Sequence, residues 1–566
     1  MKTRWGLFGL GWALLLAGAI IAHLVQTAGG TEIKDVRFMG ANGNLQSGLL
    51  YVPEGVSAED PAPAILAVHG YINSREVQSG FAIEYARRGY VVLSLDQTGH
   101  GASEGPAFSA GFGGPAALQY LRSLDIVDTD NIGLEGHSMG GWTVLAAAKA
   151  HPDDYRSIVL EGSSTGAPFA AEGDTNWPRN VSVVFSAYDE FSQLMWGVAN
   201  ADDAEQSPKL QALFGAEGPV EEGRVYGDIE AGTARVLWQP PVTHPGDHIS
   251  HAAIGHSIDW FAQTLDGGSA LPSDDQIWFA KEIGTLVSLV GWVVLVLGTI
   301  GLLLSLPSFA PLRAPVVDAA HERRGGKWWL IFALGAVIPV LDYYPIFTLA
   351  ETIFPASWLL PQTITTQVAL WAVINGVIVW GLGFVIRGAR VEFEHDTPRA
   401  VALALATIFV AYVAVLVLDF FFKTDPRFWF VGLRPLTAER FGIALVYLVP
   451  FGLYFLLAMR ALHGGLSVAG QSAAAEYLLN ALALMGGFLV FLSLQYGVLF
   501  STGQLLTPSE PLNTIVMFQF VPLLLIAALI STYTYRRTAS YVPGALINAL
   551  FVSWYVVAGQ ATQYAY

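Results

Sequence analysis

The sequence predicts two kinds of structure in one chain: an α/β domain with a mostly parallel sheet covered by helices on both faces, and an α-helical polytopic membrane domain. Three observations support this prediction. Short apolar strand patterns alternate with amphipathic helix patterns up to about residue 265. Apolar runs of about 20 residues recur from residue 283 onward, each long enough to cross a bilayer. The 566-residue chain is 53% hydrophobic, above the roughly 45 to 50% of soluble proteins.

The α/β region opens with two alternating runs, 32–39 and 45–52. Ala41-Asn42-Gly43-Asn44 joins them, which is typical of a β-hairpin. Further strands are predicted at 64–68, 90–95, 132–135, 157–160, 181–186 and 235–239, and helices at 76–88, 115–124, 139–150 and 250–265. Because strands alternate with helices after the hairpin, the sheet should be mostly parallel.

The apolar run 5–28 follows two basic residues and is longer than the usual core of a signal peptide. No clean pair of small residues for cleavage lies near Gln26, so we predict an uncleaved anchor. The predicted domains are an anchor at 1–29, the α/β domain at 30–275 and a multi-span membrane domain of about eight helices at 276–566. The predicted spans are 5–28, 283–306, 328–348, 366–387, 400–421, 441–461, 478–500, 514–534 and 540–561.

Basic residues flank these spans asymmetrically. With the N-terminus in the cytoplasm, the cytoplasmic ends hold Lys2, Arg4, Arg313, Arg323, Arg324, Lys327, Arg387, Arg390, Arg399, Arg460, Arg536 and Arg537. The opposite ends hold fewer, namely Lys281, Lys423, Arg427, Arg434 and Arg440. Basic residues that flank membrane spans are enriched on the cytoplasmic side. The chain is therefore predicted to be a multi-pass cell-membrane protein with the α/β domain and Tyr566 outside the cytoplasm.

The α/β region and the rest of the chain also differ in net charge. Residues 31–282 carry 34 acidic and 13 basic side chains, a net charge of −21, whereas the remainder carries 12 acidic and 16 basic, a net of +4. An acidic domain repels polyanions, so nucleic acid is excluded as a partner. The absence of cysteine excludes a disulfide framework, a thiolate nucleophile and cysteine-based metal sites.

Gly136-His137-Ser138-Met139-Gly140 lies between a strand pattern and a helix pattern. A serine alcohol is a poor nucleophile unless a sharp turn presents it to a base and to amide donors, and this context fits such a turn. A second match to the same pattern, at 162–166 around Ser164, precedes Pro168 and a polar stretch, so we predict a loop there.

Other polar residues follow neighbouring strands: His69-Gly70-Tyr71, the turn at 96–101, Asp189 and His244. Ligands of such sheets gather at the carboxyl ends of the strands. The arrangement resembles the α/β-hydrolase superfamily, within it the dienelactone-hydrolase-like and serine-esterase-like branches. The resemblance covers about residues 32–265 and none of the later spans.

The resemblance implies a catalytic triad in the chain order nucleophile, acid, histidine. Ser138 would be the nucleophile and Asp189 the acid, with Glu190 and Glu161 as alternatives. The base belongs to the loop before the last helix, where both His244 and His248 qualify. The length of that loop favours His244. Two later histidines, His251 and His256, are predicted to be helical surface or packing residues.

The resemblance also implies an oxyanion hole made by the backbone N–H groups of Met139 and Tyr71. His69-Gly70 matches the usual start of the second loop, and Asp96 and His100 would shape their own turn. The insertion 191–223 either covers a substrate pocket or is a surface excursion with its own apolar cluster.

Four histidines between 244 and 256 could suggest zinc, because imidazoles one helical turn apart can share an ion. Pro245 and Gly246 interrupt the helix that this would need, so no metal is predicted, and no cofactor signature is present. In the predicted membrane domain, Asp342 and Asp419 are the acidic residues closest to the apolar spans. We predict that they lie near span ends, where water reaches them, and either one would be a functional candidate if it were buried in the hydrocarbon.

These patterns predict an extracytoplasmic, membrane-anchored serine hydrolase. Its expected reaction is hydrolysis of a small or lipid-like carboxylic ester through an acyl-enzyme on Ser138, next to membrane lipids. Acyl transfer and peptide hydrolysis stay open within that class. The alternative from another class is a transporter or sensor whose hydrolase-like domain only binds a ligand.

Overall fold

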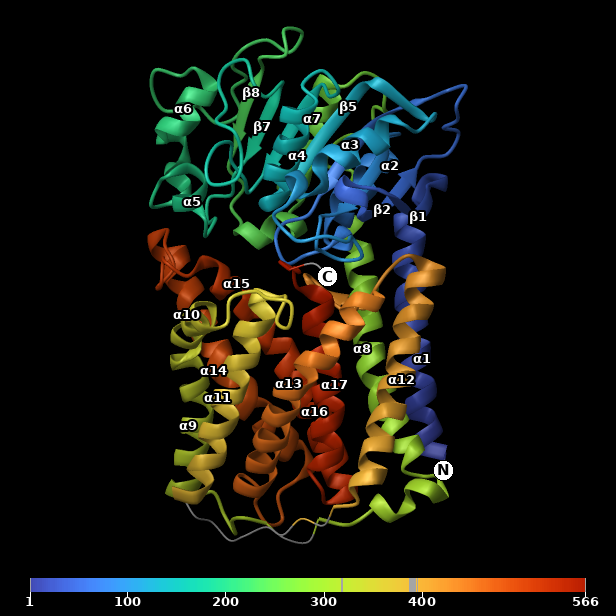
Figure 1. Cartoon of the computed structure of the whole chain (residues 1–566), viewed down its shortest axis with the longest axis vertical. Helices are drawn as coiled ribbons and strands as arrows, with labels where there is room; N and C mark the ends of the chain where they lie inside the picture. Colours follow the sequence, from blue (N-terminus) through green and yellow to red (C-terminus); the bar gives the residue numbers. More distant parts are fainter. Residues whose placement is uncertain (1, 317–318, 386–392, 394, 565–566) are drawn as a thin grey trace. The chain divides into compact units, whose positions relative to one another are not determined.

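The computed structural model describes residues 2–316, 319–385, 393 and 395–564 (Figure 1). The chain divides into two compact units, neither of which is contiguous in sequence. The α/β unit comprises Ile20–Gly284, Tyr496–Pro511 and the residues from Gly559 onward. The helical unit comprises the residues up to Ala19, Thr285–Gln495 and Leu512–Ala558.

An eight-stranded sheet organises the α/β unit, with the strand order β1-β2-β4-β3-β5-β6-β7-β8. The strands are β1 (Glu32–Met39), β2 (Leu45–Val52), β3 (Ala62–Val68), β4 (Val91–Asp96), β5 (Val127–His137), β6 (Ser157–Glu161), β7 (Val181–Val184) and β8 (Arg235–Trp238). The first two strands form the predicted hairpin, β2 pairs antiparallel with β4, and all later pairings are parallel. The predicted mostly parallel sheet is therefore confirmed.

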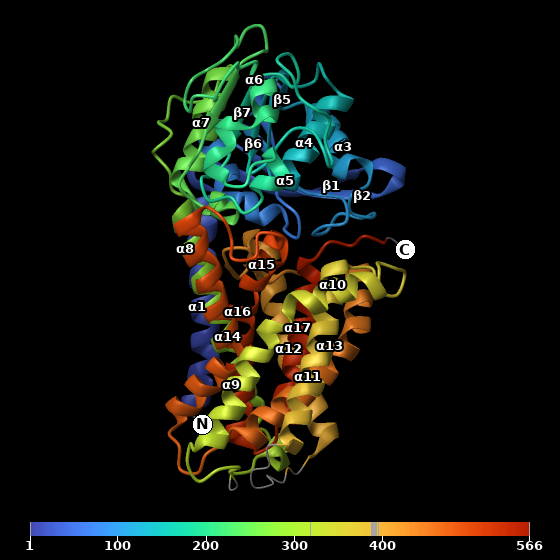
Figure 2. The ribbon, with the colours of Figure 1, turned by 90° about the vertical axis from the view of Figure 1, so that its left-hand side faces the viewer.

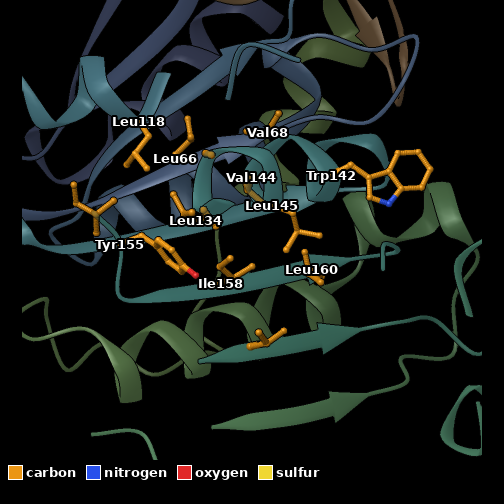
Figure 3. Packing of buried hydrophobic residues seen from close by; sticks show 14 of the residues in the cluster. Leu66, Val68, Leu118, Leu134, Trp142, Val144, Leu145, Tyr155, Ile158 and Leu160 are labelled. Atoms are coloured by element: carbon orange, nitrogen blue, oxygen red, sulfur yellow. The ribbon is translucent and has the colours of Figure 1, made fainter. Parts of the chain in front are cut away.

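Helices cover both faces because the side chains of each strand alternate. In β3, Leu66 and Val68 belong to one buried cluster, and Ile65 belongs to the other. The first cluster lies under α3 (Gly114–Arg122) and α4 (Met139–Ala150), and the second under α2 (Ser79–Arg87) and α7 (His251–Thr264). Figure 3 shows Leu66, Leu134 and Leu145 of the first cluster close together.

Helix α4 has the predicted bounds, whereas β5 begins at Val127, earlier than the apolar pattern predicts. Residues 128–131 are polar, and the pairing of β5 with β3 shifts register between Ala62 and Ala64. An apolar pattern cannot reveal a strand extension of this kind. Within the insertion 191–223 the structure has two short α-helices, α5 (Ser192–Trp196) and α6 (Pro208–Phe214).

The apolar helices are α1 (Lys2–Gln26), α8 (Trp278–Leu303), α9 (Gly326–Leu341), α10 (Tyr343–Ile353), α11 (Thr363–Val385), α12 (Thr397–Phe422), α13 (Ala438–Gly465), α14 (Ala473–Thr502), α15 (Pro511–Phe518), α16 (Phe520–Thr538) and α17 (Val542–Gly559). In the described part of the chain, eight spans are long and apolar enough to cross a membrane, or nine if the bent pair α9 and α10 counts as one. Within the helical unit α11 packs against α10 and α13 (Figure 2). These helices make the chain a candidate multi-pass membrane protein.

The predicted span 328–348 is not one straight helix. The axes of α9 and α10 meet at 47°, with Asp342 between them. Pro339 lies three residues earlier and cannot donate an N–H to the helix ladder. The carboxylate of Asp342 accepts a hydrogen bond from Asn375 Nδ2 at 3.1 Å. Arg387 and Arg390, used above for orientation, lie outside the described residues.

Candidate active site

Ser138 occupies the turn between β5 and α4, at φ 55° and ψ −121°. A non-glycine residue rarely adopts a positive φ, and such strain is a known feature of functional turns. A Cβ on Gly136 would come within 2.2 Å of the backbone of Gly140, and one on Gly140 within 2.1 Å of Val68 O. Glycine is therefore required at both flanking positions for β5, α4 and β3 to approach this closely.

The main chain of Ser138 is held by β6 and the loop that follows it. Its N–H donates to Glu161 O at 2.8 Å, and its carbonyl accepts from Ser163 Oγ at 2.7 Å. The serine is partly exposed between buried His137 and Met139. Among the residues described, its hydroxyl makes no hydrogen bond at 3.5 Å or less, and contacts of this kind are often long until substrate binds.

Asp189 and His244 form a buried pair, joined by a 2.7 Å contact between Oδ2 and Nδ1. Asp189 follows β7, and its other oxygen accepts the N–H of Phe191 at 2.7 Å. When Asp189 is ionised its carboxylate can only accept, so the hydrogen of this contact then lies on Nδ1 of the imidazole. Nε2 then keeps its lone pair and can take a proton from an alcohol.

Burial sets the ionisation of this pair. It lowers the pKa of His244 to about 4, since the low-dielectric surroundings disfavour the imidazolium. Burial, together with the nearby carboxyl of Asp247, raises the pKa of Asp189. The imidazole of His244 is therefore neutral at neutral pH, which is the form that a general base needs.

His244 lies beside the serine turn. Nε2 of His137, the residue before Ser138, contacts the carbonyl of His244 at 2.9 Å, and the two rings are 4.6 Å apart. A Cβ added to Gly162 would be 2.9 Å from His244 Nδ1. Gly162 directly follows Glu161, whose carbonyl accepts the N–H of Ser138. The structure thus brings all three predicted triad residues to one edge of the sheet.

The alternative residues have other contacts. His248 packs its ring against His137 and Phe81, at 4.0 and 6.5 Å between ring centroids. Glu190 accepts the backbone N–H of His244 at 2.8 Å instead of touching its ring. Both carboxyl oxygens of Glu161 are buried without a hydrogen-bond partner among the described residues. The geometry therefore favours His244 over His248 as base, and Asp189 over the two glutamates as its partner.

The predicted oxyanion donors come from two different loops. Met139 is the first residue of α4, where N–H groups have no acceptor inside the helix. Tyr71 follows β3 and buried His69, whose Nε2 accepts the N–H of Gln97 at 3.2 Å. A Cβ on Gly70 would come within 3.1 Å of the Ser138 Cβ, so the two loops are in close contact.

The turn at 96–101 is held by its own side chains. The Asp96 carboxylate accepts from the N–H groups of Arg75 and Ala102, at 3.0 and 3.1 Å. His100 Nδ1 lies 3.1 Å from Thr98 O. The second serine pattern is a buried irregular segment, in which Ser164 Oγ lies 3.1 Å from Lys209 Nζ. In the portion of the chain that the structure covers, no three His, Cys, Asp or Glu side chains are arranged to hold a metal.

Two segments that sequence reasoning missed belong to this unit. In the first, Tyr496 OH donates to Glu190 Oε1 at 2.5 Å. In the second, Thr562 exchanges backbone hydrogen bonds with Gly99 and Ala107, and Gln563 Nε2 donates to Tyr71 OH at 2.7 Å. Both lie at the ends of apolar helices, and no sequence pattern marks them as parts of the α/β unit.

Known proteins resemble part of this chain. Residues 63–191 match the sequence family described as the alpha/beta hydrolase fold. A monoacylglycerol lipase of Mycolicibacterium smegmatis is 27% identical over 187 residues, which cover 31% of this chain and 62% of the lipase. Esterase YjfP of Escherichia coli is 24% identical over 240 residues, covering 37% of this chain and 91% of the esterase. The chain thus spans less than two thirds of the lipase.

Among solved structures, an esterase of Pyrococcus furiosus matches 42% of this chain and 94% of its own, with 18% identity and a TM-score of 0.31. The sheet topology and the family match define the class of the globular part. The α/β unit has the α/β-hydrolase fold, and the chain joins it to a set of apolar helices.

Proposed function

We propose that this protein is a membrane-anchored serine hydrolase that cleaves carboxylic esters outside the cytoplasm. The observation that carries the proposal is the buried contact between Asp189 and His244, beside a strained serine turn. Similarity to a lipase and an esterase supports an ester substrate. The proposed organisation keeps the sequence boundaries: an anchor at 1–29, the hydrolase at 30–275 and the membrane domain at 276–566.

In the proposed reaction, His244 Nε2 takes the hydroxyl proton of Ser138 while Oγ attacks the ester carbonyl carbon. The carbonyl oxygen becomes an oxyanion, which the N–H groups of Tyr71 and Met139 stabilise. The intermediate collapses, the imidazolium gives its proton to the leaving alcohol, and an acyl-serine remains. Water, deprotonated by His244, then attacks the acyl carbon, releases the carboxylic acid and regenerates the serine.

Asp189 has two roles in this scheme. It fixes the tautomer that leaves Nε2 free, and its negative charge stabilises the imidazolium formed at each step. Triad members act as a unit, so removing the serine or the histidine alone should lower kcat by roughly 10⁶-fold. Asp189→Asn should lower kcat by roughly 10⁴-fold, because the amide can favour the wrong tautomer.

The test is covalent labelling of the purified full-length chain with a fluorophosphonate, together with hydrolysis of short-chain and long-chain p-nitrophenyl esters. The wild type should be labelled and active, and Ser138→Ala should be neither. Ser164→Ala is the matched control and should keep both properties. Labelling that persists in Ser138→Ala would refute the assignment of the nucleophile.

A transporter or sensor is the second candidate, and it rests on a separate observation. Asp342 lies at the break between α9 and α10, where a carboxylate and Asn375 meet inside the helical unit. Ionisable residues at broken spans commonly mark transport paths. Ligand transport that survives Ser138→Ala but not Asp342→Asn would favour this function.

A further inference from the structure

The segment Tyr496–Pro511 belongs to the α/β unit, although more than two hundred residues separate it from the stretch of that unit that ends at Gly284. It begins in the last turns of α14, a helix long and apolar enough to cross a membrane. Its contacts fall on residues 188–200, which directly surround the acid of the proposed triad. We call Tyr496–Gln504 the α14 segment.

Besides the contact of Tyr496 with Glu190, three close approaches join the α14 segment to residues 188–200. The rings of Phe500 and Tyr188 pack edge to face, with centroids 5.1 Å apart. Gln504 Nε2 donates to Asn200 Oδ1 at 3.1 Å. A Cβ on Gly503 would come within 3.0 Å of the Asn200 side chain. Aromatic, polar and steric contacts therefore all hold the segment against the same stretch.

The contact nearest to the chemistry runs through Glu190. Its Oε1 accepts the Tyr496 hydroxyl at 2.5 Å, and its Oε2 accepts the backbone N–H of His244 at 2.8 Å. The residue is only 9% exposed, so loss of either partner would leave a buried oxygen unsatisfied. The Glu190 carboxyl group therefore links the α14 segment, through Oε1, to the main chain of His244, through Oε2.

We propose that Tyr496 is a positioning residue, which holds Glu190 so that Glu190 fixes the backbone, and thereby the ring position, of His244. The inference rests on the proposed function, because it assigns His244 as the base. Asp189 orients the ring through Nδ1, while Glu190 anchors the chain that carries the ring. Two contacts with one residue restrict both its rotation and its translation, which proton transfer at hydrogen-bond distance requires.

The test uses the full-length chain in detergent or nanodiscs, with ester hydrolysis and the fluorophosphonate labelling rate as readouts. Tyr496→Phe removes only the hydroxyl and should lower kcat and the labelling rate by roughly tenfold with KM unchanged, since it removes one hydrogen bond to a buried carboxyl group. Tyr120→Phe is the matched control. The Tyr120 hydroxyl, also in this unit, makes no hydrogen bond with any described residue, and its loss should change neither value.

A double-mutant cycle separates positioning from general structural damage. If Tyr496 acts through Glu190, then Tyr496→Phe combined with Glu190→Ala should be no slower than Glu190→Ala alone. Glu190→Gln keeps an oxygen that can accept the N–H of His244, so it should recover most of the activity lost in Glu190→Ala. Thermal unfolding of each variant checks that the comparison is made on folded protein. If Tyr496→Phe does not fold, the comparison of Glu190→Gln with Glu190→Ala still tests whether Glu190 positions His244.

Different results identify different failures. Equal kcat and labelling in Tyr496→Phe and the wild type would overturn the positioning role while leaving the hydrolase proposal intact. Effects of Tyr496→Phe and Glu190→Ala that multiply independently would also overturn it. A folded wild type that is neither labelled at Ser138 nor active on any ester would overturn the proposed function itself, and this inference with it.

Discussion

Oδ2 of Asp189 and Nδ1 of His244 lie 2.7 Å apart although 55 positions separate the two residues in the chain. Asp189 follows β7 and His244 follows β8, and these neighbouring parallel strands end at the same edge of the sheet. The pair is buried, so its hydrogen bond is protected from competing water.

Replacement of the two candidate bases should have unequal effects. His244→Ala removes the ring that contacts Asp189, and kcat should fall by roughly 10⁶-fold, as for loss of the nucleophile. His248→Ala removes a ring that packs on His137, so it should lower stability by about 1 to 3 kcal/mol and leave labelling of the folded protein within a few-fold of wild type. Fluorophosphonate labelling rates and thermal unfolding measure the two effects. A larger loss of labelling in His248→Ala would assign the base to that residue instead.

The acidic limb of the pH–rate profile should lie well below the ordinary histidine range. Burial lowers the pKa of His244 from 6.5 to about 4, and the base is active only when neutral. Protonation therefore removes activity as the pH falls toward 4, and kcat/KM at about pH 5.5 should stay close to its neutral value. A base with an unshifted pKa would retain roughly a tenth of its activity there. Measuring kcat/KM between pH 4 and 8 distinguishes the two results.

Glu161 should make stability fall as the pH rises. Burial, with Asp247 and Glu135 nearby, raises the pKa of Glu161. The folded state then binds a proton that the unfolded chain releases above about pH 4.5, so its contribution to stability decreases with increasing pH. Glu161→Gln mimics the protonated side chain, and its melting temperature should gain on the wild type between pH 5 and pH 8. Exposed Glu59→Gln is the control, and an advantage of Glu161→Gln that does not change with pH would contradict the prediction.

The glycines around Ser138 should not tolerate a methyl group. A Cβ at residue 140 would come within 2.1 Å of Val68 O, so Gly140→Ala should cost at least about 1 to 3 kcal/mol in unfolding free energy and slow labelling of Ser138. Gly218→Ala is the matched control, since nothing lies within 4 Å of a Cβ at residue 218. Denaturant unfolding and labelling report both effects. Similar stability of the two variants would mean that the turn relaxes easily.

The orientation of the hydrolase domain can be tested with introduced thiols, because the chain has no cysteine. Glu59→Cys lies at an exposed position of the α/β unit, and Glu322→Cys lies beside Arg323 and Arg324 in a predicted cytoplasmic loop. A membrane-impermeant maleimide applied to intact cells should label the first variant and reach the second only after permeabilisation. The opposite pattern would reverse the predicted topology.

Local sequence patterns predicted much of the α/β unit, because its strands, helices and turns depend mainly on residues that are close together in the chain. The hairpin, helix α4 and the serine turn follow from alternation, from helical periodicity and from glycines at fixed spacing. Loop length favoured His244 over His248 as the proposed base, and only the structure shows how their contacts differ, since both lie in one loop. The break at Asp342 was missed because the apolar pattern continues across it.

The contacts of Tyr496 and Gln563 were beyond sequence reasoning for another reason. Each partner is hundreds of positions away, and nothing in the apolar helix before it indicates where the next residues pack. Long-range packing of this kind depends on the tertiary arrangement, which local periodicity does not encode. Glu190 illustrates the result: it was an alternative acid from its position, and its observed contact is with a backbone N–H of the base loop.

The α/β unit is built from three stretches of chain that are synthesised at different times. The sheet and the Asp189–His244 pair are translated first, whereas Tyr496–Pro511 and the residues from Gly559 onward follow most of the apolar helices. If Tyr496 positions His244 through Glu190 as proposed, a nascent chain cannot cleave esters at full rate until those helices have been made. Full activity would then coincide with the late stages of biosynthesis.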